Sequence, residues 1–307
     1  MQDVVIIGGG PAGITAAIYA ARKQLDFVII SPDIGGQAAW ASDVENYLGY
    51  TMISGFDLVE KFEEHVKKYN IDVIDDRVTA LEHRDKTFLT KLESGKEYES
   101  RAVIVASGRS ARNLGVPGEE EYKGKGVAYC ATCDAPLFAG EDVAVVGGGN
   151  AGLSAAVQLS KIARHVDLIE EFPKLMGDAT FISRLSGANN VKIRTNTEVV
   201  KVTGNKLVEG ISIRDLNTKA TQDIPVTGVF VEIGSLPNTG FLPKDVNLTS
   251  SGEIVIDCAN RSNVPGLFAA GDVSNVPHKQ IIIAAGEGAK ALLSAYDYIV
   301  RNFSDGA

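Results

Sequence analysis

Cysteine is scarce in this chain: only three of its 307 residues are cysteines. That number excludes a secreted fold held together by a framework of disulfides. Two of them, Cys130 and Cys133, stand as Cys-x-x-Cys, and Cys258 lies far away in the segment IVIDC. In this apolar context we expect Cys258 to be a buried structural thiol.

Long apolar runs and an excess of positive charge are also missing. No run approaches the ~20 apolar residues that cross a bilayer, and the N-terminal VVII has no basic segment before it, unlike a secretory signal. The formal net charge is −9, which disfavours a nucleic-acid or anionic-membrane partner. We therefore expect a cytoplasmic protein, and the length favours two domains.

The chain contains an internal repeat, because residues 4–31 align without a gap on residues 143–170. Each copy runs from an apolar strand through a glycine loop and an Ala-rich helix to a second apolar strand, which is the pattern of a βαβ unit. The repeat predicts an α/β protein with two Rossmann-like three-layer domains, the second inserted in the first. We expect residues 1–112 and 236–307 to form the first domain and residues 113–235 the second.

Both copies carry the spacing G-x-G-x-x-G. The first glycine permits the tight turn, the second lets the backbone approach a pyrophosphate, and the third lets the helix pack closely on the strand. A single copy could be a tight strand-to-helix turn without a ligand, but two copies in full βαβ context predict two dinucleotides, most simply FAD and NAD(P)H. The glycines are Gly8, Gly10 and Gly13 in the first copy and Gly147, Gly149 and Gly152 in the second.

Two further apolar runs end in small residues. They are AVIVASG, which ends at Gly108, and LFAAGD, which ends at Gly271 and Asp272. Ligands of open parallel sheets bind beyond the carboxyl ends of the strands, so Asp272 stands where a cofactor hydroxyl could meet it. A helix N-cap or a turn residue is the other interpretation of Asp272.

The pair Cys130 and Cys133 is spaced to close a small disulfide ring. A helix that begins at such a pair favours the thiolate of one cysteine, and Asp134, which follows directly, could donate or accept a proton. Half of a zinc site and a pair of inert buried cysteines are the alternatives. Structural zinc needs four ligands, and the chain has neither a second Cys-x-x-Cys nor a ligand-spaced cluster among its four histidines, so we expect no metal.

The Cys pair lies just upstream of the second glycine motif, so the nicotinamide and the disulfide would share the second domain. Both cannot lie against the flavin at once without crowding. We therefore expect a rotation between the domains during the reaction, with hinge residues near 108–115 and 234–238.

Together these motifs resemble the low-molecular-weight thioredoxin reductases (class II of the pyridine nucleotide-disulfide oxidoreductases) over essentially the whole chain. They are similar in particular to the flavin part of the alkyl hydroperoxide reductase flavoprotein. The larger glutathione-reductase-like enzymes are disfavoured, because their Cys-x4-Cys and catalytic His-Pro pair are missing. The matching stretches are GGGPAG (8–13), GGQ (35–37), VENY (44–47), CATCD (130–134), GGGNAG (147–152), IGSLPNT (233–239), FAAGD (268–272) and KQIIIAAGEGAKA (279–291).

The resemblance implies specific roles. Asp272 would bind the ribityl chain of FAD, and Gln280 and Ile281 would approach the isoalloxazine from a helix N-terminus. The FAD site as a whole would comprise Gly8, Gly10, Pro11, Ala12, Gly13, Ser31, Gly35, Gly36, Gln37, Asn46, Gly108, Gly271, Asp272, Lys279, Gln280 and Ile281. The nicotinamide coenzyme would be held by Gly147, Gly149, Asn150, Ala151, Gly152 and Glu170.

For the redox centre, the resemblance implies that Cys133 is the sulfur nearer the flavin, Cys130 the one that exchanges with the substrate, and Asp134 the acid/base. Electrons would pass from nicotinamide to flavin, to the Cys pair and then to a thioredoxin- or glutaredoxin-like protein. Members of the family are homodimers, so we expect a homodimer.

Alkyl hydroperoxide reductase flavoproteins carry an additional N-terminal relay, so here we expect any relay to be a separate small protein. One alternative function is therefore a stand-alone NADH-dependent reductase of a peroxiredoxin relay. Another is a disulfide reductase fed by a different donor such as ferredoxin. A third is a non-catalytic FAD-binding sensor.

The nicotinamide site departs from that of the NADPH-dependent thioredoxin reductases. Where those enzymes carry a basic HRR-type cluster, this chain reads Ile169-Glu170-Glu171. A carboxylate there accepts hydrogen bonds from a ribose diol and repels a 2′-phosphate, and the nearest cations are Lys174 and Arg184. We predict NADH as the coenzyme, with NADPH less favoured.

Overall fold

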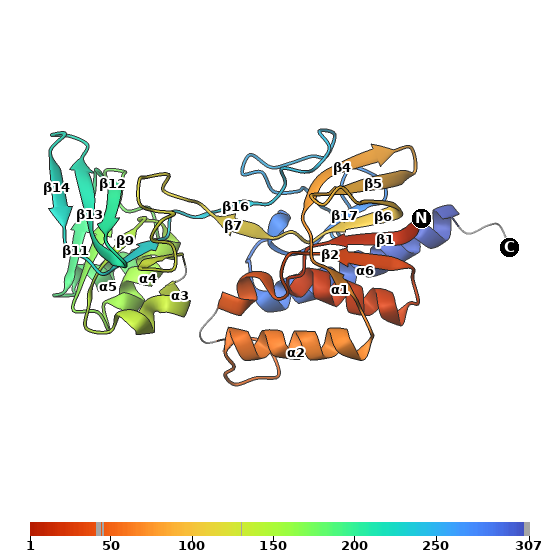
Figure 1. The fold of residues 1–307 in the computed structure, drawn as a ribbon, viewed down its shortest axis with the longest axis horizontal. Helices are drawn as coiled ribbons and strands as arrows, with labels where there is room; N and C mark the ends of the chain where they lie inside the picture. The colour runs from red at the N-terminus through yellow and green to blue at the C-terminus, as the bar shows by residue number, and fades with distance from the viewer. Residues whose placement is uncertain (41–43, 45, 130, 304–307) are drawn as a thin grey trace. The chain divides into compact units, whose positions relative to one another are not determined.

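The protein is described by a computed structural model that covers residues 1–40, 44, 46–129 and 131–303. The chain divides into two compact units, Met1–Ser110 with Leu236–Ala307 and Ala111–Ser235. The first boundary falls after Ser110, whereas the sequence places it after Arg112. We call the discontinuous unit the first unit and the inserted one the second unit (Figure 1).

The first unit is built on a seven-stranded sheet of the described residues, in the order β3-β2-β1-β6-β5-β4, with β17 also paired with β6. Strands β1, β2, β3, β6 and β17 are parallel, and β4 and β5 are antiparallel. The strands are β1 (Gln2–Ile7), β2 (Phe27–Ile30), β3 (Val73–Ile74), β4 (Val78–Arg84), β5 (Thr87–Leu92), β6 (Glu97–Val105) and β17 (Leu267–Ala269). The helices are α1 (Pro11–Arg22), η1 (Gly36–Trp40), α2 (Gly55–Lys68), η3 (Gly271–Val273) and α6 (Ile281–Phe303).

Both faces of this sheet are covered, which explains why its parallel strands are continuous apolar runs. On one face, α1 and α6 pack with β1 and β6 around a core that includes Ile14 and Leu292 (Figure 1). On the other face, Val5 and Val103 pack with Phe88 and Ile254. The result is three layers.

The second unit repeats this plan. A five-stranded parallel sheet in the order β11-β10-β9-β15-β8 accompanies a three-stranded antiparallel sheet, β12-β13-β14, among the described residues. Leu153 and Leu159 of α4 pack on one face of the parallel sheet, and Val202 and Ile211 of the antiparallel sheet pack on the other. The strands are β8 (Val127–Ala128), β9 (Asp142–Val146), β10 (His165–Ile169), β11 (Val191–Arg194), β12 (Thr197–Gly204), β13 (Val208–Asp215), β14 (Thr221–Ile224) and β15 (Gly228–Val231). The helices are α3 (Ala131–Asp134), η2 (Ala135–Phe138), α4 (Asn150–Leu159) and α5 (Ala179–Ser186).

Two short strands carry the chain between the units. β7 (Arg109–Ala111) leads into the second unit and β16 (Ser235–Pro237) leads out of it, and the two pair as a two-stranded sheet. Each is preceded by a glycine in the left-handed region, Gly108 at φ +64° and Gly234 at φ +93°. Both crossings fall within the segments where the sequence predicts hinges.

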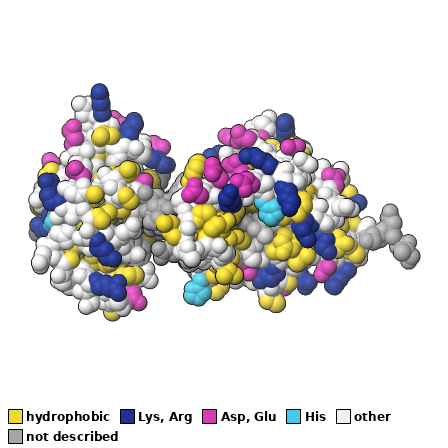
Figure 2. Space-filling view, turned by 90° about the horizontal axis from the view of Figure 1, so that it is seen from below, with side chains coloured by type: hydrophobic (Ala, Val, Ile, Leu, Met, Phe, Trp, Pro, Cys, Tyr) yellow, Lys and Arg dark blue, Asp and Glu magenta, His cyan; other side chains and the backbone are white. Residues whose placement is uncertain are grey.

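The predicted fold class, an α/β protein with two Rossmann-like three-layer domains, is confirmed. None of the described helices combines the length and the apolar character that a membrane span requires. On the face shown in Figure 2, the acidic and basic side chains are interspersed.

The expectation for Cys258 is wrong, because its side chain is exposed. The carboxylate of Asp257 accepts hydrogen bonds from the backbone N–H groups of Ala259 and Arg261, both at 2.9 Å. These bonds fold the segment into a turn. The apolar run therefore ends before Cys258, and Ile254 is its buried residue.

Candidate functional site

The first glycine motif forms the turn between β1 and α1. Gly8 has φ +114°, and a Cβ there would overlap the carbonyl of Ala106, while a Cβ at Gly13 would overlap the carbonyl of Gly8. A Cβ at Gly10 would meet no atom within 4 Å. Gly10 is the N-cap of α1 and supplies no side-chain hydrogen bond. The fold therefore requires two of the glycines, and the third leaves space at the positive end of a helix, where anions bind.

The second motif, between β9 and α4, has the same geometry. Gly147 has φ +125°, and its Cβ would overlap the carbonyl of Glu232, while a Cβ at Gly152 would overlap the carbonyl of Gly147. Around Gly149, the N-cap of α4, a Cβ would again meet nothing within 4 Å. The repeat in the sequence is therefore also a repeat of the local structure.

The residues of the GGQ stretch lie against the first glycine turn. The N–H of Gly35 donates to the carbonyl of Gly9 at 2.8 Å. A Cβ on Gly36 would lie 3.4 Å from the Cα of Gly10. Two glycine segments thus flank the same open space at the carboxyl edge of the sheet.

The structure also joins expected FAD residues that are far apart in the sequence. Asn46 Nδ2 donates to Gln280 Oε1 at 3.0 Å across 234 positions. Gln37 Nε2 donates to the backbone carbonyl of Arg109 at 2.5 Å. These contacts place the loop after β2 beside the start of α6 and the root of β7.

Asp272 lies inside η3, a single turn whose N-cap is Ala270, so Asp272 is not an N-cap, but it does stand in a turn. Burial raises the pKa of its carboxyl, and the nearby charges of Lys279 and Arg109 oppose that shift. Gly271, at φ +74°, brings the same turn close to Ala12, whose Cβ would be 3.2 Å from a Cβ on the glycine. The strand end of β17 therefore meets the N-terminus of α1.

At the edge of the second unit, Glu170 follows β10 and is only 7% exposed. Its carboxylate accepts hydrogen bonds from the backbone N–H of Gly148, in the glycine turn, and from that of Phe172 at 2.9 Å. Lys174 and Arg184, the nearest cations in the sequence, are both exposed. An acidic side chain thus stands directly beside the second glycine turn.

Of the two cysteines in the Cys-x-x-Cys pair, Cys130 lies outside the described residues, and Cys133 belongs to the single-turn helix α3. Their disulfide stays a prediction. On the N-terminal side, Tyr129 Oη donates to Glu119 Oε1 at 2.8 Å, and the same carboxylate accepts from the N–H groups of Leu114 and Gly115, both at 2.7 Å.

Two carboxyl groups accompany α3. Burial raises the pKa of Asp134, the acid/base expected from the sequence. Glu232, at the carboxyl end of β15, accepts a hydrogen bond from the backbone N–H of Ala131 at 3.2 Å. Burial raises its pKa too, and the bond from Ala131 opposes the shift. Both groups can hold a proton next to the predicted dithiol.

Residues 2–288 match the model of the pyridine nucleotide-disulphide oxidoreductase family. The chain belongs to this family. The resemblance to thioredoxin reductases is confirmed, since the thioredoxin reductase of Lactococcus lactis is 31% identical with a TM-score of 0.81, over 98% of this chain and 100% of that one.

Curated relatives of this oxidoreductase carry two kinds of name. A protein of Ferdinandcohnia aciditolerans named NADH dehydrogenase is 46% identical over 98% of the chain. The alkyl hydroperoxide reductase F-subunit of Staphylococcus aureus (strain MSSA476) is 45% identical over the same share. The chain spans only 58% and 59% of the lengths of these two relatives.

Three glutamates of this oxidoreductase, Glu119, Glu232 and Glu253, were not predicted from its sequence. Glu232 had a signal, because it follows the fully buried strand β15 just as Glu170 follows β10. Glu253 had none, since its charged partners Arg109 and Lys279 are distant in the sequence. The partners of Glu119, which include Leu114 and Tyr129, are near in the sequence, but no motif marks them. Among the described residues, no three His, Cys, Asp or Glu side chains gather as a metal site.

Proposed function

We propose that this oxidoreductase passes electrons from NADH through FAD and the Cys130–Cys133 disulfide to a disulfide of a thioredoxin- or glutaredoxin-like protein. The observation that carries the proposal is the duplicated glycine turn. Both copies leave the second glycine open at an uncapped helix N-terminus. Two such turns in a chain with Cys-x-x-Cys fit two dinucleotides that serve one dithiol.

The first unit fits FAD. Gly10 and Gly36 flank the space that a pyrophosphate needs, and the helix N-terminus supplies N–H donors for it. Asp272 would accept a hydrogen bond from a ribityl hydroxyl, and Asn46 donates a hydrogen bond to Gln280 just before α6. When bound, FAD would supply two-electron chemistry between nicotinamide and disulfide.

The second unit fits a nicotinamide coenzyme, and Glu170 favours NADH. The carboxylate is held next to Gly148 in the glycine turn. There it can accept hydrogen bonds from a ribose diol, and it repels a 2′-phosphate. The name NADH dehydrogenase given to the relative from Ferdinandcohnia aciditolerans agrees with this preference.

At the dithiol, the thiolate of Cys130 would attack the partner disulfide and form a mixed disulfide, releasing one partner thiolate. Cys133 would then displace the second partner sulfur and close the Cys130–Cys133 disulfide. Two electrons leave the enzyme, and the two partner thiolates take up two protons. Asp134 and Glu232, whose pKa values are both raised by burial, are the groups that can store such protons.

The names of the relatives support a small redox protein as the acceptor, either thioredoxin itself or the relay of a peroxiredoxin system. We also propose a homodimer, as the resemblance implies, and light scattering of the purified protein tests it directly.

Anaerobic titration of the flavin-loaded protein tests the function. We expect NADH to bleach the flavin absorbance rapidly and NADPH to do so much more slowly, followed by turnover on thioredoxin- or glutaredoxin-like proteins. Bleaching by neither coenzyme would point to another donor such as ferredoxin. Bleaching without turnover on any protein disulfide would instead favour a non-catalytic FAD-binding sensor.

A further inference from the structure

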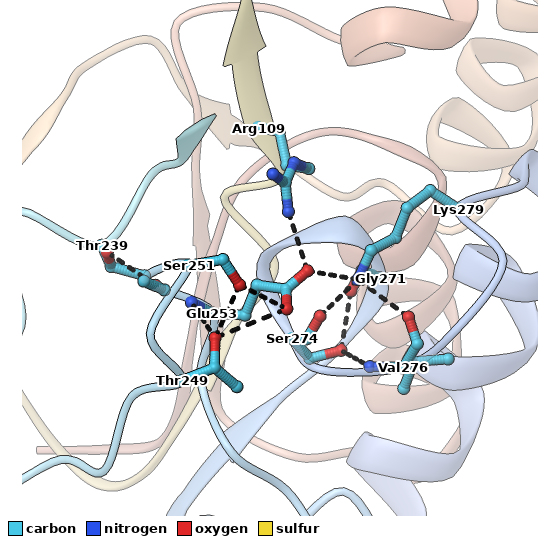
Figure 3. A network of polar contacts seen from close by, with 10 residues as sticks. Arg109, Thr239, Thr249, Ser251, Glu253, Gly271, Ser274, Val276 and Lys279 are labelled. Carbon is cyan, nitrogen blue, oxygen red and sulfur yellow. Dashed lines mark hydrogen bonds and ion pairs between the residues drawn. The ribbon is translucent and has the colours of Figure 1, made fainter. Parts of the chain in front are cut away.

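Glu253 is the centre of a cluster of charges in the first unit (Figure 3). Its Oε1 lies 2.8 Å from Arg109 Nη1 and 3.1 Å from Lys279 Nζ. The side chains of Glu253, Arg109 and Lys279 are 18%, 15% and 29% exposed, so solvent screens these pairs less than it screens surface pairs.

The other carboxylate oxygen of Glu253 is also held. Ser251 Oγ donates to Oε2 at 3.1 Å, and Thr249 Oγ1 lies at 3.5 Å. The backbone N–H of Glu253 in turn donates to Thr249 Oγ1 at 3.1 Å. The carboxylate is therefore fixed in one orientation, toward Arg109 and Lys279.

The cluster joins three segments that are distant in the sequence. Arg109 is the first residue of β7, and its backbone carbonyl accepts the hydrogen bond from Gln37 of η1. Glu253 lies in the loop before Ile254, and Lys279 stands just before α6. One carboxylate thereby connects the root of β7 with the segment that leads into α6.

Lys279 closes its own loop. Its Nζ donates to the backbone carbonyls of Ser274 at 2.5 Å and Val276 at 2.8 Å. The preceding residue, His278, has φ +62°, a conformation that is unfavourable for a residue with a side chain. Such a conformation persists where neighbouring contacts hold it, and here the ammonium of Lys279 makes those contacts.

The segment held in this way carries expected FAD contacts at both ends. Asp272 stands at its start, in the field of Lys279 and Arg109. Gln280 and Ile281 stand at its end, where Gln280 also bonds Asn46. The ammonium of Lys279 is turned toward its own loop and Glu253, so besides its field at Asp272 it acts on the site through the backbone.

We propose that Glu253 is a positioning residue of the FAD site. By holding Arg109 and Lys279 together, it sets the course of residues 271–280 and so presents Asp272 and Gln280 to the cofactor. This inference rests on the proposed FAD site in the first unit, and the experiment separates the two.

The test is titration of the apoprotein with FAD, comparing wild type with Glu253→Gln. Glutamine keeps the size of the side chain and removes its charge. We expect the dissociation constant for FAD to rise about tenfold or more. The matched control is Glu82→Gln in the same unit, because Glu82 also pairs with two cations, Arg84 and Lys91, but its side chain is 41% exposed. It should leave FAD affinity unchanged.

A rescue distinguishes positioning from a general loss of stability. Asparagine, whose short side chain can hydrogen-bond locally, is among the few residues that adopt the left-handed conformation readily, so adding His278→Asn to Glu253→Gln should restore part of the FAD affinity. The flavin midpoint potential should rise in Glu253→Gln, because the cations are no longer neutralised near the reduced, more negative flavin.

Three results would overturn the inference: wild-type FAD affinity in Glu253→Gln, an equal loss in Glu82→Gln, or no recovery with His278→Asn. Failure of the wild-type apoprotein to bind FAD would instead overturn the proposed function. Should Glu253→Gln not fold, Ser251→Ala removes only a hydroxyl that orients the carboxylate. It should weaken FAD binding several-fold, and an unchanged affinity would again contradict the proposal.

Discussion

At the scale of the residue, one of the positions at which the two repeats differ lies directly after the second strand, where the first unit has Ser31 and the second has Glu170. Each follows the second strand of its repeat and lies beside the middle residue of its turn. A Cβ on Gly9 would be 2.8 Å from Ser31 Oγ, and Gly148 donates its N–H to Glu170. The same position thus carries a neutral hydroxyl in one unit and a buried carboxylate in the other.

Exchanging this residue should change coenzyme preference. We expect Glu170→Ser combined with Glu171→Arg to raise the ratio of kcat/KM for NADPH over NADH by about tenfold or more, because a repulsive charge is replaced by an attractive one. Steady-state kinetics with both coenzymes measures it, and Glu171→Arg alone is the control. An unchanged ratio would show that Glu170 does not select the coenzyme.

Replacing Glu170 should also affect stability. Its carboxylate is the acceptor for two backbone N–H groups, those of Gly148 and Phe172. Leaving a buried donor without a partner costs about 1–3 kcal/mol. Thermal unfolding of the double variant should therefore be measured alongside its kinetics, so that a loss of folded protein is not taken for a loss of coenzyme binding.

Glu232 should make stability depend on pH. Because burial raises the pKa of its carboxyl in the folded protein, the protonated form favours folding. This contribution is fully present below the ordinary pKa and is lost as the pH rises through the folded value. Glu232→Gln keeps an acceptor for the N–H of Ala131 and removes the ionisation. Its free energy of unfolding should therefore increase relative to that of wild type as the pH rises.

Urea denaturation at pH about 5 and about 8 checks this expectation. The difference between Glu232→Gln and wild type should be larger at the higher pH. Exposed Glu209, in β13 of the same unit, supplies the control variant Glu209→Gln. A difference that does not change with pH would mean that Glu232 titrates in the same range in the folded and unfolded chains.

At the scale of the element, each strand–turn–helix unit separates what folding needs from what a ligand needs. Gly147 is required by the left-handed turn and by the nearby carbonyl of Glu232, whereas a side chain at Gly149 would contact no protein atom. Substitutions at these two positions, two residues apart, should therefore affect different properties: stability at Gly147 and ligand binding at Gly149.

We expect Gly149→Ala to leave the melting temperature close to that of wild type and to raise the KM for NADH, because the new methyl group projects toward the pyrophosphate. Gly147→Ala should lower stability by about 1–3 kcal/mol or more. Gly187→Ala is the control, since its Cβ would lie 3.7 Å from the nearest atom. Normal NADH binding by Gly149→Ala would argue against a dinucleotide at this turn.

Sequence reasoning worked best for these elements, because glycine spacing and apolar runs are local signals. It failed for Cys258, where a turn made by Asp257 ends the apolar run. It also missed the role of Glu253, whose partners Arg109 and Lys279 lie 144 positions before it and 26 positions (279 minus 253) after it. No local pattern marks a carboxylate whose partners come from other segments.

At the scale of the whole molecule, the chain crosses between its two units through β7 and β16, each preceded by a glycine with positive φ. Neither Gly108 nor Gly234 would bring a Cβ within 4 Å of another atom. A change to alanine there acts through the backbone torsions alone, since no side chain is displaced.

If a rotation between the units alternates access to the flavin, Gly108→Ala and Gly234→Ala should lower kcat by roughly tenfold. In stopped-flow measurements, one of the two half-reactions of these variants, flavin reduction or disulfide reduction, should be slower than in wild type. Gly95→Ala is matched in φ, at +85°, and in open surroundings, but lies in the β5–β6 hairpin. It should change stability and not kcat. Normal kcat in both linker variants would contradict the rotation.

Local patterns in the chain were enough to predict the class of the fold and the kind of chemistry, because repeats, glycine spacing and Cys-x-x-Cys need no knowledge of distant contacts. Tertiary structure decided which side chains share an edge of a sheet: Asn46 with Gln280, Glu232 with the backbone of α3, and Glu253 with both of its cations. The reason is physical. Parallel strands bring their carboxyl ends to one edge whatever their separation along the chain, so a site built there comes from segments that only folding places together.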